Sequence, residues 1–343
     1  MRGITGFAAA LSLLTALHAG ARASPVGEQS AALSRSLATA EHRLGRSAPQ
    51  LLPILAPLAQ LRFEQGEFAE ATALRRRALK IAIAAYGSAS VPSAEAMAGL
   101  ARLYIAQRRY LDAEPLVIAA ADVLRDRLGK ASPALAAVAA DRARIALARG
   151  DDDAARNWAE QAIAIDKQDG GAPHGDRLRV QGEVLVAEGA FADGERALRQ
   201  ALALDRAAGD RLATARDLAG LGNAYLRQQR FSDALPAIEE AAWIDQGHLG
   251  AAHPLVAEDF HTLGQAYLAL DRPADAAKAL HTAIDVLERG AGRDTPALAY
   301  TELDLARAEH ALGHDDKAEA LFNNARRVLN GAEDEERDRQ RQA

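Results

Sequence analysis

The sequence lacks cysteine entirely and has only two tryptophans and two methionines in 343 residues. Without cysteine the chain has no disulfide framework and no thiol chemistry. Neither sign of charge dominates, since 41 lysines and arginines stand against 47 aspartates and glutamates and leave a net charge of −6. The chain therefore offers no strongly basic face to a phosphate backbone, and we expect no nucleic acid partner.

Sequence signatures of catalysis are also missing. The chain contains no G-x-x-x-x-G-K-[ST] phosphate loop, no G-x-S-x-G nucleophile elbow and no H-E-x-x-H metal motif. His310 and His314 stand four residues apart beside two aspartates, which suggests a metal site, but a turn begins at Gly313 and separates their helix faces. A metal site needs three or four placed ligands, so we expect no metal there. Because the catalytic and phosphate-binding motifs are missing, we also expect no cofactor and no enzymatic activity.

The long apolar run of the chain lies at its N-terminus. Phe7 to Leu17 is apolar, follows Met1-Arg2 and precedes Ala21-Arg22-Ala23, a small-x-small cleavage pattern. The run is too short to span a bilayer, and the alternative interpretation is an ordinary first helix. We predict that residues 1–23 are a signal peptide cleaved near Ala23 and Ser24. The mature protein is then periplasmic or secreted and has no transmembrane segment.

Small residues are abundant and recur at a fixed spacing. The template is three small residues separated by twelve and then seven positions, and it fits seven times. Successive copies are 42, 42, 39, 40, 42 and 42 residues apart, and a period near 40 is typical of a solenoid or array. All 21 positions hold alanine or glycine: Ala59, Ala101, Ala143, Gly182, Gly222, Gly264 and Ala306 in the first column; Ala71, Ala113, Ala155, Gly194, Ala234, Ala276 and Ala318 in the second; Ala78, Ala120, Ala162, Ala201, Ala241, Ala283 and Ala325 in the third.

Each repeat contains two apolar runs of helical period on either side of a short polar turn, such as Arg108-Arg109. The repeat unit is therefore helix, turn, helix. Two helices approach closely only where the side chains between them are small. The three columns of alanine and glycine provide such contact points. A bulky side chain there would overpack the junction.

The chain resembles the tetratricopeptide repeat family in a stretch with counterparts in every repeat: Leu221-Gly222-Asn223-Ala224-Tyr225, Phe231, Ala234 and Ala241. It is similar to the kinesin-light-chain-type variant in its 42-residue step, in His253-Pro254 and in its closing glycines, which are Gly87, Gly129, Gly250 and Gly292. The resemblance, to a bacterial exported member, implies an all-α fold, a right-handed α-solenoid of about seven helix-turn-helix repeats. It also implies a non-enzymatic binding scaffold.

The repeats predict the organisation of the chain. A capping helix over residues 24–46 precedes repeats 1–3 (residues 47–169), and repeats 4–7 (residues 176–330) precede a charged tail (residues 331–343). Residues 170–175, rich in glycine and proline, are either a loop that absorbs the shortened step or a flexible joint between two sub-arrays. In the seventh repeat Glu302 and Glu309 replace apolar residues, which predicts a partly exposed last repeat.

The candidate binding site is a polar row on the first helices, which line the concave surface in proteins of the family that the chain resembles. The row is polar in every repeat, and acidic or basic residues also follow its far edge. Between them Ala56, Ala98 and Ala140 predict a shallow apolar floor. The candidate protein-binding residues are Arg102, Arg144, Glu183, Asn223, Gln265, Glu95 and Arg216; the alternative is that they are merely solvated.

Arg102 and Arg144 occupy equivalent places in adjacent repeats, so stacking should bring their guanidinium groups together. The two groups repel each other unless a carboxylate lies between them, and Glu95 is the candidate for it. If the pair is only partly satisfied, it binds an acidic side chain or a C-terminal carboxylate. We therefore expect repeats 1–3 to hold the main contact with the partner.

These observations predict an exported, non-enzymatic scaffold that binds another protein or peptide in its concave groove. The alternative is a structural or regulatory subunit of an envelope or membrane-associated complex, which uses its ends or its convex face.

Overall fold

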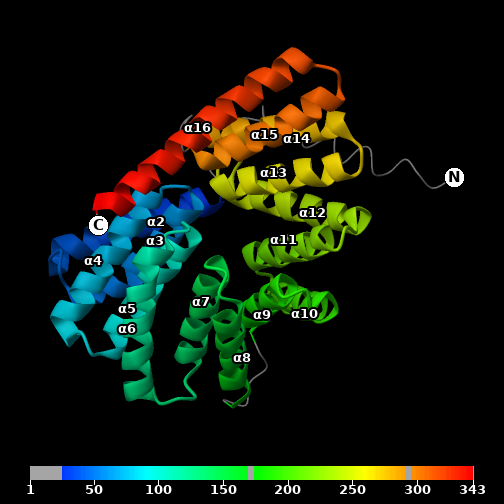
Figure 1. The fold of residues 1–343 in the computed structure, drawn as a ribbon. Coiled ribbons are helices and arrows are strands. Elements are labelled where there is room, and N and C mark those ends of the chain that lie inside the picture. The colour runs from blue at the N-terminus through cyan, green and yellow to red at the C-terminus, as the bar shows by residue number, and fades with distance from the viewer. Residues whose placement is uncertain (1–24, 169–173, 291–294, 343) are drawn as a thin grey trace. The chain divides into compact units, whose positions relative to one another are not determined.

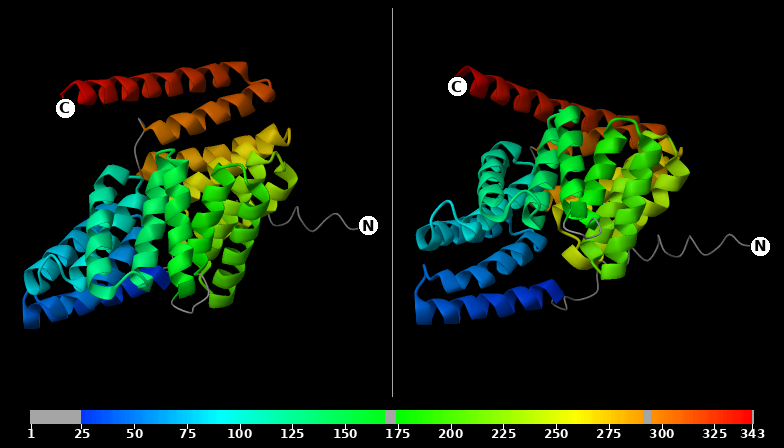
Figure 2. Two further views of the ribbon diagram at one scale, coloured as in Figure 1. Left: turned by 60° about the horizontal axis from the view of Figure 1, so that its bottom comes forward. Right: turned by 90° about the horizontal axis from the view of Figure 1, so that it is seen from below.

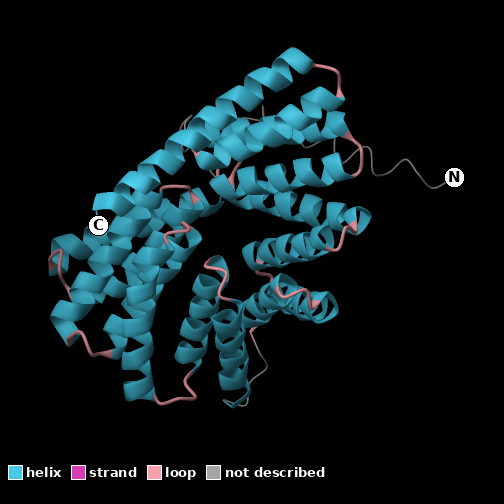
Figure 3. Cartoon of the chain, viewed as in Figure 1, coloured by secondary structure: helices cyan, strands magenta, loops and turns pink. Residues whose placement is uncertain are grey.

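The computed structural model describes residues 25–168, 174–290 and 295–342. All regular secondary structure within these ranges is helical, and no strand occurs in them (Figure 3). The described helices fall into two units, one over residues 25–228 and one from residue 229 onwards. We call them the N-terminal unit and the C-terminal unit and describe each by itself.

The N-terminal unit begins with α2 and the 3-10 helix η2 and continues in helical pairs (Figure 1). Each pair consists of a first and a second helix joined by a short turn. The helices are α2 (Pro25–Leu44), η2 (Pro49–Leu51), α3 (Leu52–Glu64), α4 (Phe68–Tyr86), α5 (Val91–Ala106), α6 (Tyr110–Leu128), α7 (Pro133–Ala148), α8 (Asp152–Gln168), α9 (Gly175–Ala187), α10 (Phe191–Ala208) and α11 (Arg211–Arg227).

The C-terminal unit contains one helix and two further pairs. They are α12 (Phe231–Leu249), α13 (Pro254–Ala269), α14 (Pro273–Gly290), α15 (Pro296–Ala311) and α16 (Asp315–Gln342). Within each unit, helices that follow one another in the chain lie side by side (Figure 2). The predicted fold class, an all-α stack of helix-turn-helix repeats, is confirmed.

Two kinds of contact connect neighbouring repeats. Each second helix packs against the first helix of the next repeat, as α4 does against α5 and α14 against α15. First helices also pack against first helices, in the order α5, α7, α9 and α11 in the N-terminal unit and α13 with α15 in the C-terminal unit. The first helices α5, α7, α9 and α11 therefore form a continuous layer on which side chains of successive repeats meet.

The small columns are the points where these helices touch. All 21 residues are buried except Ala318 in the last repeat, which is half-buried. A Cβ on Gly182 would lie only 3.0 Å from the carbonyl oxygen of Gly194 and 2.6 Å from Cγ of Leu198. Backbone therefore approaches backbone directly inside this helical pair, as the spacing predicts.

The turn inside each repeat has a feature that the sequence does not reveal. All seven turns place a residue with positive φ seven positions after the first column, namely Gly66, Arg108, Gly150, Gly189, Gln229, Asp271 and Gly313. Four are glycine, while Arg108, Gln229 and Asp271 adopt φ values of 53–58°. A left-handed residue here ends the first helix, and glycine is preferred without being required.

The last repeat differs from the prediction. Glu302 and Glu309 are 8% and 5% exposed, so the expectation of a partly exposed repeat is wrong at both positions. Nδ2 of Asn324 donates to both carboxylate oxygens of Glu302 at 2.8 Å, and His314 lies on Glu309. The acidic residues are thus tolerated in the interior because polar partners from the turn and from α16 meet them.

Predictions on residues 1–23, 170–173 and 343 fall outside the described residues. The division between the two units lies at Gln228 and Gln229, inside the predicted fifth repeat. A joint at residues 170–175 stays a prediction. None of the described helices is long and apolar enough to cross a membrane.

Candidate functional site

The polar row of the first helices lies on the surface, as predicted. Gln60, Arg102, Asn223, Gln265 and Arg307 are exposed, whereas Arg144 and Glu183 are half-buried. The apolar floor beside the row is absent at its centre, because Ala98 and Ala140 are 2% and 0% exposed. The layer of first helices closes over these alanines, so the surface that α5 and α7 present beside the row is polar.

Arg102 on α5 and Arg144 on α7 do share a carboxylate, but it belongs to Asp141. Nε of Arg102 donates to Oδ2 of Asp141 at 3.0 Å, and Nη1 of Arg144 donates to Oδ1 at 2.9 Å. Asp141 is 1% exposed, and its burial raises its pKa in spite of the two arginines. Glu95, the carboxylate proposed from the sequence, is exposed and does not bridge the pair.

The same alternation of charge continues into the next repeat. Arg144 also donates to Asp176 of α9, and Nη2 of Arg179 donates to the same oxygen of Asp176 at 2.6 Å. Burial alone would raise the pKa of Asp176, but the surrounding arginines hold it well below its usual range. Arg179 in turn donates to Glu183 at 2.9 Å. We call the residues from Arg102 to Glu183 in this chain of ion pairs the charge ladder.

The arginines of the charge ladder differ in whether their guanidinium groups are fully used within the chain or can still contact a partner. Arg144 is 17% exposed and both of its contacts are to carboxylates, so its guanidinium is fully engaged. Arg102 is 52% exposed, and among the described residues only its Nε donates a hydrogen bond. Asn223 and Arg216 are exposed on α11. The structure brings Arg102, Arg144 and Glu183 into one network and leaves Arg102 as its open end.

The C-terminal unit repeats this arrangement on α13 and α15. Asp304 holds the place of Asp141 in its repeat, since it precedes Arg307 as Asp141 precedes Arg144. It accepts from Nε2 of Gln265 at 2.9 Å and from Nη1 of Arg307 at 3.0 Å, and His261 contacts it at 2.9 Å. These hydrogen bonds lower the pKa of Asp304 against the effect of its burial. Gln265 is therefore part of a network within the chain.

Two buried carboxyl pairs occupy equivalent junctions between repeats. In the N-terminal unit Asp205 of α10 faces Asp217 of α11, and in the C-terminal unit Asp245 of α12 faces Asp259 of α13. Asp217 is 0% exposed, and Nε of Arg179 lies 3.5 Å from its Oδ1. Burial and the neighbouring carboxyl group raise the pKa of Asp217 and of Asp259 to about 8. Both aspartates are therefore largely protonated at neutral pH.

The histidines near the last turn contact single carboxylates. Nδ1 of His310 lies 2.7 Å from Asp315, and Nδ1 of His314 lies 2.5 Å from the buried Glu309. The two imidazoles have different partners, in agreement with the turn predicted at Gly313. In the part of the chain that the structure describes, no three acidic or histidine side chains converge as a metal site would require.

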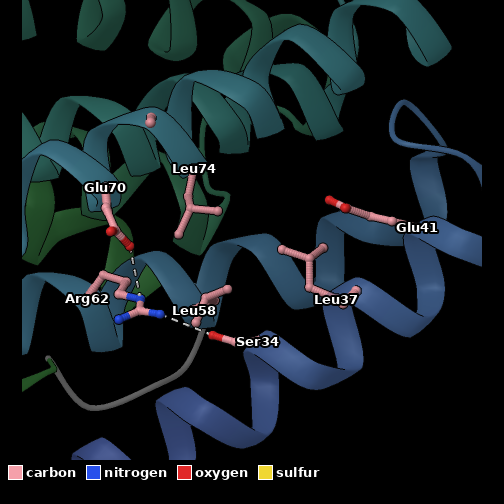
Figure 4. A pocket seen from close by; sticks show the side chains of 9 residues that line it. Ser34, Leu37, Glu41, Leu58, Arg62, Glu70 and Leu74 are labelled. Atoms are coloured by element: carbon pink, nitrogen blue, oxygen red, sulfur yellow. Dashed lines mark hydrogen bonds and ion pairs between the residues drawn. The ribbon is translucent and has the colours of Figure 1, made fainter.

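One cavity of about 330 Å³ lies between α2, α3 and α4 (Figure 4). Leu37, Leu58 and Leu74 give it an apolar wall. Its polar wall is satisfied from within, because Nη2 of Arg62 donates to Ser34 at 3.2 Å and Nε lies 3.4 Å from Glu70. Among the residues that line the cavity, we find no polar side chain left without a partner for a ligand to contact.

The bridging carboxylate of the charge ladder, Asp141, was missed from the sequence. Asp141 stands among alanines in AAVAADRARIALA and gives no motif, although Asp304 at the equivalent place is a signal that a column-by-column comparison could have found. Asp217 and Asp259 were missed for the same reason. A buried aspartate has no periodic signature of its own.

Comparisons with known proteins support the repeat architecture. The family model described as tetratricopeptide repeat matches residues 51–117 and 93–168. A comparison with curated proteins found no match.

Solved structures are similar in fold at low sequence identity. The apo form of the quorum sensor NprR from B. thuringiensis is 12% identical, with a TM-score of 0.55 over 78% of this chain and 76% of that chain. Aspartyl phosphate phosphatase F from Bacillus subtilis is 15% identical, with a TM-score of 0.52 over 86% and 75%. BtubC from P. vanneervenii is 19% identical over 78% and 92%, with a TM-score of 0.39.

The helical pairs and their buried small columns define the class: an all-α protein of stacked helix-turn-helix repeats. The family match identifies residues 51–168 as tetratricopeptide repeats, and the remaining helical pairs follow the same spacing. This fold is typical of scaffolds for protein–protein interaction.

Proposed function

We propose that the chain is an exported, non-enzymatic scaffold that binds another protein through the surface of its first helices, with the main contact around Arg102 on α5. The observation that carries the proposal is the open end of the charge ladder. Arg102 is half-exposed and donates only through Nε, so the rest of its planar fork faces solvent. Its neighbours on the ladder are held by carboxylates of the chain and serve the fold.

The test is capture of a partner from an extract of the natural host with the purified full-length chain, followed by measurement of its affinity. We expect Arg102→Ala to weaken binding about tenfold or more, and we expect the loss to shrink at high salt. Arg307→Ala is the matched control, because Arg307 is 72% exposed and donates to Asp304 as Arg144 does to Asp141.

The control should leave the affinity within about twofold, since a single solvated ion pair contributes little. If Arg102→Ala keeps its helicity by circular dichroism and binds the partner with unchanged affinity, the contact does not lie on the first helices.

A second candidate function is a structural or regulatory subunit that uses its second helices. The observation that favours it is on α6, where Leu111 and Ile118 are 83% and 40% exposed and lie seven residues apart on one face. Exposed apolar side chains on one helix face are typical of interaction sites. Loss of capture in Leu111→Ser and Ile118→Ser, but not in Arg102→Ala, would favour this candidate.

A further inference from the structure

Arg75 on α4 lies at a position that is apolar in the later second helices. It stands three residues before the third small column, where the following repeats have Val117, Ala159 and Leu198. These three side chains are 1%, 2% and 0% exposed and belong to the core. An arginine in this place is partly buried and must bring its charge to the edge of the core.

The guanidinium of Arg75 lies on Gly99 of α5. A Cβ at Gly99 would be 2.6 Å from Nη1 of Arg75 and 3.3 Å from Cζ, so the missing side chain provides the space. Gly99 is the counterpart of Asp141, since each precedes an arginine of the polar row by three residues. The first ladder position thus has an arginine where the next repeat has a carboxylate.

No hydrogen bond or ion pair to Arg75 is found among the residues that the structure describes, and Arg102 lies one turn beyond Gly99. Burial lowers the pKa of Arg75, and the charge of Arg102 lowers it further, which indicates that no carboxylate compensates either effect. Burying a cation without a partner is costly. A ligand that supplies the partner removes this cost.

At the junction of repeats 1 and 2, Arg75 faces Gly99 and has no carboxylate partner among the described residues. Among the same residues, Arg102 has only Asp141, which it shares with Arg144. The junction therefore has a place for one further carboxylate, which could face both guanidinium groups.

We propose that Arg75 and Arg102 together bind one aspartate or glutamate side chain of the partner protein at the junction of repeats 1 and 2. The proposal rests on the proposed function and names the chemistry that the partner presents there. Gly99 leaves the space for the site, Arg75 provides the partly buried cation and Arg102 provides the exposed one. Arg144, engaged on both sides, only holds Asp141 in place.

The test uses the full chain and a blocked peptide, acetyl-Gly-Gly-Asp-Gly-Gly-amide, with dissociation constants and arginine Nε–H signals followed by NMR. We expect Arg75→Met to keep the helicity and weaken binding at least tenfold, because an apolar side chain suits the position held by Val117, Ala159 and Leu198. Lys80→Met removes an exposed charge from the same helix and should change the constant less than twofold.

Gly99→Asp is a second variant that keeps both arginines. It supplies the carboxylate that the next repeat has at Asp141, so peptide binding should again fall at least tenfold. The proposal is overturned if Arg75→Met binds the peptide as the wild type does. Two further peptides replace the aspartate, one by asparagine with a free C-terminus and one by phosphoserine with blocked ends. The proposal is also overturned if either binds tenfold more tightly than the aspartate peptide.

The two proposals can fail separately. If the captured partner depends on Arg102 but not on Arg75, the proposed function stands and the carboxylate site is wrong. If the peptide depends on both arginines while the captured partner depends on neither, the site stands and the partner binds elsewhere.

Discussion

At the scale of single residues, the helix junctions of this chain contain buried aspartates as well as small apolar residues. Asp141, Asp217 and Asp259 are 1%, 0% and 8% exposed. The first faces two arginines, and each of the others faces a neighbouring carboxyl group. Burial raises the pKa of all three; the neighbouring carboxyl group raises the pKa of Asp217 and Asp259 further, whereas the two arginines at Asp141 act in the opposite direction.

The carboxyl pairs make stability depend on pH. The pKa of Asp217 is about 8 in the folded chain, against about 4 when unfolded, so the folded state binds more protons between these values. The contribution of Asp217 to stability is complete below pH 4 and is lost as the pH rises through 8, at up to about 1.4 kcal/mol per pH unit. We expect Asp217→Asn to flatten this fall, because an amide keeps a donor to Asp205 and does not titrate.

Urea unfolding of the wild type and Asp217→Asn at pH 5, 6.5 and 8 checks the expectation. Asp259→Asn should have the same effect in the C-terminal unit, and Asp153→Asn, at an exposed position near the start of α8, should have none. Equal slopes for the wild type and Asp217→Asn would show that Asp217 is ionised throughout this range.

At the scale of helices, the small columns set how closely two elements pack. Ala201 on α10 is 0% exposed, while Ala203 two residues later points to solvent. We expect Ala201→Leu to destabilise the chain by about 1–3 kcal/mol through overpacking. Ala203→Leu, the matched change on the same helix, should shift stability by less than about 0.5 kcal/mol. Thermal unfolding measures both, and similar shifts would contradict the assignment of the third column.

The helices were predictable because their signal is periodic, and the site was predictable only in part. Column spacing predicts seven helical pairs, and each observed turn follows the first column at a constant distance. The polar row predicted that Arg102 and Arg144 would meet. It did not predict Asp141 as their bridge or Arg75 as a neighbour of Arg102, because both depend on side chains that cross between helices. The contacts of these side chains depend on their rotamers and on how deeply they are buried, and the sequence pattern specifies neither.

At the scale of the whole molecule, each repeat buries its apolar faces only against its neighbours, so the stack is a sum of local junctions. In the N-terminal unit the charge ladder spans α5, α7 and α9. A network of this extent joins three repeats whose apolar contacts are pairwise. We infer that the ladder couples the unfolding of these repeats.

Export is the remaining property of the whole molecule, and it is proposed from Phe7 to Leu17 and from Ala21-Arg22-Ala23. A chain without cysteine needs no oxidant or reductant on either side of a membrane, so its packing suits both compartments. We expect the protein from its natural host to begin near Ser24 and to be recovered outside the cytoplasm, and N-terminal mass spectrometry of fractionated cells measures both. Cleavage removes Arg2 and Arg22 and no acidic residue, so the net charge moves from −6 to −8. A soluble cytosolic protein that starts at Met1 or Arg2 would refute export, and the partner would then have to be sought in the cytoplasm with the same arginine variants.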